Sequence, residues 1–245
     1  MRVMPDVVVP AADRIHWRNE WLDSWQSFPV AGNFDLAANA HGLLLVHNDD
    51  TVDAGEGFDS HQHADVEIVT WVLDGSLVHR DSLGNEGTIT PGLAQRMSAG
   101  SGVVHSERNG AGYSAGTPLR VVQMWLPPDE NGRPPGYEEY AAAGELASGR
   151  LVTVASGLDR DRGGTAVGLG QSKAALHVAR LRPGTPVTLP TAPFLHLFVA
   201  RGTVEIDGIG TLGPGDALRG TDTGGHVVHT TSSAEILVWE MHAHA

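Results

Sequence analysis

Residues 57–107 read GFDSHQHADVEIVTWVLDGSLVHRDSLGNEGTITPGLAQRMSAGSGVVHSE, and glycine or proline turns divide this stretch into short segments rich in β-branched residues. Such segments favour strands, and closely spaced turns favour short strands over helices. Similar segments recur on both sides: LLLVHN near 43, LRVVQMWL from 119, and then LHVARL, LHLFVA, TVEID and EILVWEM. Many short strands at this spacing predict an all-β sandwich or barrel.

The composition of the 245-residue chain agrees with this class, because 31 Gly and 14 Pro indicate many turns. A formal net charge of −13 and a single lysine, Lys173, argue against direct binding to nucleic acid or to an anionic membrane. The chain has no cysteine, so disulfides and thiolate ligands are excluded and any metal must be held by nitrogen and oxygen. No apolar run resembles a signal peptide or reaches the length of a membrane span, so we expect a cytoplasmic protein.

We expect two domains joined near residue 140. Residues 136–150, GYEEYAAAGELASGR, favour helix through Ala, Glu and Leu and follow a Pro-Pro break. This segment is predicted to be a short helical linker between a first domain, 1–135, and a second domain, 151–245. In addition, VTWVLDGSLVHRDSLGNEGTITPGLA in the first domain resembles LHLFVARGTVEIDGIGTLGPGDALR in the second, which indicates two similar halves.

The densest chemical signal is HQHADVE, followed about forty residues later by GSGVVHSE. Alternate side chains of a strand share a face, so His61 and His63 can point at one spot and His105 and Glu107 at another. Two neighbouring strands would join these spots into one site of three imidazoles and a carboxylate. Such donors suit Zn, Fe, Ni, Cu or Co, and four protein ligands leave one or two coordination positions open for substrate, water or dioxygen.

Residues 57–107 are similar, taken together, to the pirin family of the cupin superfamily, whose pattern is GFxxHxHxxxEIxTxVLxG with HxDSxGNxGxxxPGxxQxMxAGxGxxHSE. Weaker similarity extends the resemblance to about residues 15–140, and many members have a proline where this chain has Gln62. The resemblance implies a bicupin, which is a pair of face-to-face β-barrels with one divalent transition metal in the first barrel. Iron is the expected metal, with Zn, Ni, Co, Cu or Mn as alternatives, and the ligands implied are His61, His63, His105 and Glu107.

The fourth ligand has an alternative in Glu67. Cupins in general often use a glutamate at the position that matches Glu67, and spacing by two would place it on the same face as His61 and His63. The spacing alone leaves both glutamates open. The pirin pattern favours Glu107.

The other histidines are not expected to bind the metal. We expect His79 to be structural, with Asp81 and Ser82 as its hydrogen-bond partners, and Gln95 and Met97 to be core or pocket-wall residues. His16, His41, His47 and His177 have no partner at ligand spacing and are expected to be structural or exposed. His242 and His244 repeat the His-x-His spacing, but further ligands are lacking there, so no functional metal is expected.

The second barrel is expected to have lost its metal site. If Gly202 corresponds to Gly75, then Thr188 and Pro190 occupy the places of the histidine pair, and neither can replace a histidine as ligand. We therefore expect a structural role for this half and for its histidines, His196, His226 and His229.

The resemblance implies an enzyme, because bacterial pirin-like proteins include members that open quercetin-like flavonols with dioxygen and release carbon monoxide. A flavonol could chelate an open metal position through its 3-hydroxyl and 4-carbonyl oxygens, and Glu107 is the candidate base for the hydroxyl proton. The alternative is a non-catalytic regulator, since other pirins bind transcription factors or metabolic enzymes as protein partners. Another small-molecule role, such as isomerase or sugar-binding protein, has no specific motif here.

Overall fold

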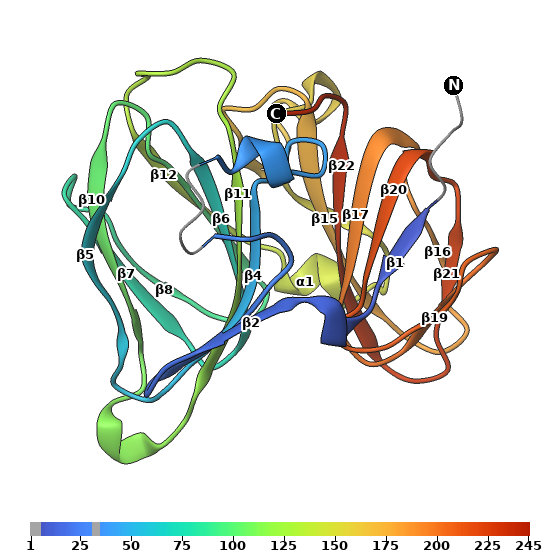
Figure 1. Ribbon diagram of the computed structural model, residues 1–245, viewed down its shortest axis with the longest axis horizontal. Coiled ribbons are helices and arrows are strands. Elements are labelled where there is room, and N and C mark those ends of the chain that lie inside the picture. The colour runs from blue at the N-terminus through green and yellow to red at the C-terminus, as the bar shows by residue number, and fades with distance from the viewer. Residues whose placement is uncertain (1–5, 31–34) are drawn as a thin grey trace.

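The computed structural model describes residues 6–30 and 35–245, and it consists almost wholly of β-strands arranged in two halves that lie side by side (Figure 1). Each half pairs one seven-stranded sheet with one four-stranded sheet. The all-β, two-barrel fold predicted from the sequence is thus confirmed. Among the described residues, no helix has the length and apolar character needed to cross a bilayer.

The first half is built from antiparallel strands. Its large sheet has the order β12-β9-β6-β11-β4-β3-β2 and its small sheet the order β5-β10-β7-β8. The strands are β2 (Ile15–Arg18), β3 (Leu22–Gln26), β4 (Val46–Val52), β5 (Gly57–His63), β6 (Glu67–Asp74), β7 (Leu77–Asp81), β8 (Glu86–Ile89), β9 (Leu93–Ser98), β10 (Val103–Asn109), β11 (Leu119–Leu126) and β12 (Gly136–Ala141).

The second half repeats this plan. Its large sheet has the order β1-β20-β17-β22-β15-β13-β14 and its small sheet the order β16-β21-β18-β19. The strands are β1 (Val7–Val9), β13 (Val152–Ser156), β14 (Val167–Gly168), β15 (Ala174–Leu181), β16 (Val187–Thr188), β17 (Ala192–Arg201), β18 (Val204–Ile206), β19 (Gly210–Leu212), β20 (Ala217–Thr223), β21 (Val227–His229) and β22 (Ala234–Met241).

The internal repeat seen in the sequence corresponds to one structural unit in each half. In the first half β6 pairs with β9 and β7 with β8, and in the second β17 pairs with β20 and β18 with β19. Gly75 and Gly202 occupy the matching turns with φ of 74° and 70°. A Cβ at either position would lie within 3.0 Å of a backbone carbonyl oxygen, so both turns require glycine.

The linker differs from the prediction. Residues 136–141 form β12, which pairs with β9, and the only α-helix of the described chain is α1 (Ala143–Leu146). The helix-favouring composition is overridden because β9 offers an unpaired sheet edge. At the other end of the chain, β1 joins the large sheet of the second half through β20. The first half therefore extends to Ala141, and the second includes a strand from the beginning of the chain.

The two large sheets share one apolar core. In β6, Val69, Trp71 and Leu73 pack against residues of the second half that include Phe198 and Trp239. Two polar contacts cross the same boundary: the Trp71 indole N–H donates to Glu235 Oε1 at 2.8 Å, and the Trp239 indole N–H lies 3.1 Å from the Met124 sulfur. The halves are therefore joined by a continuous buried interface.

Alternate residues of β6 face the other way, into the first barrel. Cross-strand partners share a face, so Thr70 lies on the same side as its partners Gln123 of β11 and Gln95 of β9. The large sheet of the first half is thus buried on both sides. The odd-numbered residues of β6 face the second half, and the even-numbered residues of β6 face the interior of the first barrel.

We predict that Trp71→Phe destabilises the protein by about 1–3 kcal/mol, because it keeps the aromatic ring but leaves the buried Glu235 without its indole donor. Thermal unfolding should therefore shift to lower temperature. The matched control is Trp17→Phe at a side chain that is 42% exposed, which should change stability by less than about 0.5 kcal/mol. Equal unfolding midpoints for the two variants would contradict the importance of this bond.

Candidate metal centre

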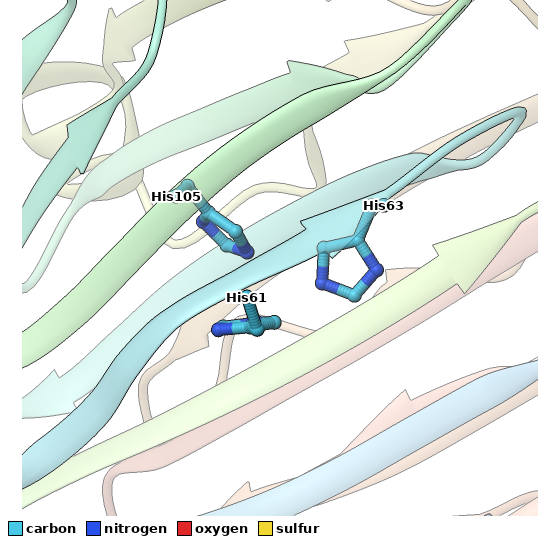
Figure 2. A group of neighbouring side chains, drawn as sticks. All are labelled: His61, His63 and His105. Carbon is cyan, nitrogen blue, oxygen red and sulfur yellow. The ribbon is translucent and has the colours of Figure 1, made fainter.

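Three histidines meet where β5 and β10 pair in the small sheet of the first half (Figure 2). His61 and His63 alternate on β5 and so share a face, and the register sets His105 directly opposite His61. The ring centroids lie 4.8 Å apart for His61–His63, 4.4 Å for His61–His105 and 5.0 Å for His63–His105. One nitrogen of each ring lies within 4.8 Å of the others, which is close enough for the three to bind one ion.

The imidazoles are in the form that a metal requires. Burial lowers the pKa of His63 to about 4, with a contribution from the neighbouring His61. Burial, followed by His61 and His63, lowers the pKa of His105 to about 3. Both rings are therefore neutral at pH 7, as ligation demands.

The hydrogen bonding of the ring nitrogens also fits a bound ion. The Nδ1–H of His61 donates to the Asp59 carbonyl at 2.7 Å, and His105 Nδ1 lies 3.5 Å from His79 Nδ1. The Nε2 atoms of His63 and His105 are buried and have no hydrogen-bond partner. Buried polar atoms without partners are costly, and a cation would satisfy them. The residues present thus fit a first-row transition metal.

Glu107 lies next to this cluster and does not belong to its tightest part. A β-bulge between β5 and β10 shifts the register between His105 and Glu107. The Glu107 carboxylate groups instead with His105 and His79, with one ligand atom of each within 4.8 Å of the others. Its Oε2 accepts a hydrogen bond from Gln123 Nε2 at 2.8 Å. Two overlapping trios therefore share His105, and Glu107 remains the carboxylate within reach of it.

Glu67, the alternative fourth ligand, faces away from the histidines. Its partners across the sheet, Ser98 and Leu126, lie on the interface side of the first large sheet. Glu67 Oε2 accepts hydrogen bonds from Ser98 Oγ at 2.8 Å and from the Gly170 amide at 2.9 Å. Glu67 therefore links the two halves. It does not face the histidines, because β6 belongs to a different sheet from β5 and the alternation of side chains along β5 does not continue into β6.

His79 is closer to the site than the sequence indicated. It is fully buried on β7, directly across from Glu107, and its Nε2 lies 3.4 Å from Asp81 Oδ2. The predicted Asp81 contact is confirmed, whereas Ser82 Oγ accepts from the Val104 amide instead. The sequence does show that His79 and Asp81 alternate and so share a face of one strand. It does not show that this strand, β7, pairs with β10, and this pairing is what brings His79 to the site.

The remaining candidates lie apart from the cluster. Gln95 and Met97 face the barrel interior, where Met97 packs in an apolar cluster with Ile68 and Val103 and Gln95 is buried with an unpartnered side-chain oxygen. In the described ranges, groups of metal-binding geometry occur only around His105. The other histidines bind carbonyls, carboxylates or hydroxyls, or pack against rings: His16, His41, His47, His177, His196, His226, His229, His242 and His244.

The interior of the second barrel is filled by apolar side chains. Thr188 ends β16 and Pro190 follows it, where the first half has its histidine pair. Fifteen buried residues from the second half, including Leu189, Leu195 and Val238, form one cluster there. This packing leaves the second barrel without the polar interior of the first.

A cavity of about 420 Å³ opens onto the three-histidine cluster. His61, His63 and Glu107 contribute to its wall. Aromatic side chains line much of the rest: Trp17, Trp21, Phe58 and Trp125. A cavity of about 690 Å³ elsewhere on the surface contains none of the candidate ligands.

Two face-to-face β-barrels with a histidine cluster in the first define a bicupin. The chain belongs to the pirin family, whose family model, described as Pirin, matches residues 9–126. It is 50% identical over 95% of its length, and 93% of the relative's, to a Mycobacterium tuberculosis protein named "Putative quercetin 2,3-dioxygenase". It is 32% identical, over 94% of its length and 96% of the relative's, to the quercetin 2,3-dioxygenase of Escherichia coli.

A solved structure has the same fold. The bacterial pirin YhhW from Escherichia coli, crystallised in complex with nickel(II), superimposes with a TM-score of 0.84 and 30% identity, covering 97% of this chain and 99% of that one. Pirin-type proteins thus include one that binds a transition metal.

We predict that the protein binds about one first-row metal ion per chain and that Glu107→Gln weakens binding by about 10-fold or more, because the substitution removes a charged oxygen beside His105. Glu67→Gln is the matched control, since this buried glutamate faces the other half. Elemental analysis and chelator competition give the stoichiometry and affinity. Two tightly held ions per chain, or metal lost only from the Glu67 variant, would contradict the assignment.

We also predict that His79→Phe lowers metal affinity by about 10- to 100-fold, because it removes the nitrogen that lies against His105 Nδ1 while preserving the ring packed against Tyr137. Chelator competition again provides the measurement. His16→Phe, at an exposed ring stacked on Trp25, is the control. Affinity equal to that of the unchanged protein would show that His79 does not orient His105.

Proposed function

We propose that this protein is a metal-dependent dioxygenase that opens quercetin-like flavonols with molecular oxygen. The observation that carries the proposal is the opening of an aromatic-lined cavity directly onto three converging imidazoles. The names of the relatives support the same reaction. The ligands proposed are His61, His63, His105 and Glu107, and iron is the metal expected, with Ni, Co, Cu, Zn or Mn as alternatives.

The cavity fits a planar aromatic substrate. Trp21 and Phe58 meet edge to face with ring centroids 5.3 Å apart, and Trp125 packs against His63 at 4.9 Å. Such rings pack well against the faces of flavonol rings and keep water from the reacting carbon atoms. A metal bound at the histidines would act as a Lewis acid that acidifies the coordinated 3-hydroxyl group of a flavonol.

Glu107 is the group placed to accept that proton. Burial raises the pKa of its carboxyl, while the hydrogen bond from Gln123 lowers it. The Trp125 indole donates to Gln123 Oε1 at 3.2 Å, and Gln123 in turn donates to Glu107 Oε2, so this chain of bonds fixes the carboxylate. Oε1 is the oxygen left to hold the proton. A fixed base with a raised pKa takes a proton from an acidified hydroxyl near neutral pH.

We predict that the metal-loaded protein, given quercetin in air, bleaches the near-visible absorption of quercetin, consumes dioxygen and releases carbon monoxide. His61→Ala and His63→Ala should each lower the rate by more than about 100-fold, because removing a ligand costs more than disturbing its neighbours. Carbon monoxide should be measured together with absorbance, since flavonols also oxidise unaided.

The control is the His61→Ala protein with the same metal concentration. Equal rates of carbon monoxide release in the control and the unchanged protein, across the metals named, would reject the dioxygenase function. A non-catalytic metal-binding regulator would then be the surviving proposal, and a stable metal-dependent complex with a protein partner would be the result to seek.

A further inference from the structure

The cavity has a polar wall of which the proposed chemistry uses only Gln123. It is formed by the large sheet of the first half, whereas the histidines come from the small sheet. Gln26, Asn48 and Gln123 are cross-strand partners in one row, and Ser24 and Asp50 are partners in the next. All five side chains line the cavity. Because cross-strand partners share a face, they form a continuous polar patch beside the candidate metal centre.

Two oxygen atoms in this patch have no hydrogen-bond partner. Asp50 is 5% exposed, and its Oδ1 is buried and unpartnered; its side-chain partner is Ser24. The side-chain oxygen of Asn48 is likewise buried and unpartnered. Within residues 6–30 and 35–245, no basic side chain forms an ion pair with Asp50. Buried acceptors without donors destabilise a protein unless a bound molecule supplies the donors.

The neighbouring Asp49, on the same strand, has the basic partners that Asp50 lacks. Asp49 is about as buried as Asp50, at 7%, and faces the other side of the sheet. There Arg120 donates to both of its oxygens, at 2.9 Å and 2.8 Å, and Arg14 lies 3.8 Å away. The carboxylate on the interface side is therefore neutralised, and the one on the cavity side is not. Burial accordingly raises the pKa of Asp50 to about 7.

We propose that Asp50 and Asn48 form a second binding subsite that accepts hydrogen bonds from ring hydroxyl groups of a polyhydroxylated aromatic ligand. This subsite rests on the proposed function in that it takes the same ligand class. It receives hydroxyls other than the 3-hydroxyl that would meet the metal. The aromatic walls hold the ring faces, and the two oxygens select ligands by the number and position of their donors.

The test compares the affinities of two flavonols that share the 3-hydroxyl and 4-carbonyl pair. Quercetin carries four further hydroxyls, and 3-hydroxyflavone carries none. Dissociation constants are measured on metal-loaded protein under nitrogen by quenching of tryptophan fluorescence. Asp50→Ala should lower the ratio of quercetin affinity to 3-hydroxyflavone affinity by about 10-fold, since a buried acceptor of the further hydroxyls is lost. Asn48→Ala should lower it by a few-fold.

Asp49→Asn is the matched control, because it removes an equally buried carboxylate on the same strand and should leave the ratio unchanged. Asp50→Leu has nearly the same shape as the native side chain but no acceptor oxygen, so it provides a second variant that should still lower the ratio if Asp50→Ala does not fold. An unchanged ratio in both the Asp50 and the Asn48 variants would overturn the subsite and show that these oxygens hold only water.

Binding and turnover separate this inference from the proposed function. Selective binding that depends on Asp50, without carbon monoxide release in air, would support the subsite and reject the dioxygenase. Carbon monoxide release in air, together with equal affinities for the two flavonols, would support the dioxygenase and reject the subsite.

Discussion

The packing of the two large sheets against each other is the constraint on which the rest of the structure depends. It buries β6 and β11 on both faces, so each of these strands must present one set of side chains to the shared core and the alternate set to the first barrel. A slip of one residue would move Trp71 out of the core and turn Thr70 into it. The apolar interface therefore fixes which polar side chains face the cavity, including Gln123, which positions Glu107.

The two halves use the same strand plan for different purposes. The second barrel is filled by aliphatic side chains such as Leu195 and Val238, and this filling makes it a rigid support. The first barrel places polar residues on the matching surface and has smaller apolar clusters, so that a cavity remains beside the histidines. The second half thus contributes packed apolar core, and the first half contains the candidate site. The shared interface holds the first barrel against the well-packed second one.

Much of this arrangement could be predicted from the sequence, and the exceptions have physical reasons. His61, His63 and His105 could be predicted as one group because the alternation of side chains along a strand and the family pattern are both visible in a short stretch of sequence. The strand at 136–141 was missed because Ala, Glu and Leu favour helix, and only the edge of β9 determines otherwise. The nearness of His79 to the site and the unpartnered Asp50 depend on which strands become neighbours, and that choice is made by tertiary packing.

The pairing of β1 with β20 has a consequence for how the chain folds during synthesis. β1 is translated before the whole first barrel, whereas its partner strand β20 is translated after that barrel and after most of the second half. The first barrel can therefore close while β1 is still unpaired, and the large sheet of the second half gains β1 only after β20 has been made. A strand that precedes the first barrel thus completes a sheet of the half that is made after it. Cutting the chain between the barrels would then leave the first fragment holding a strand that belongs to the large sheet of the second half.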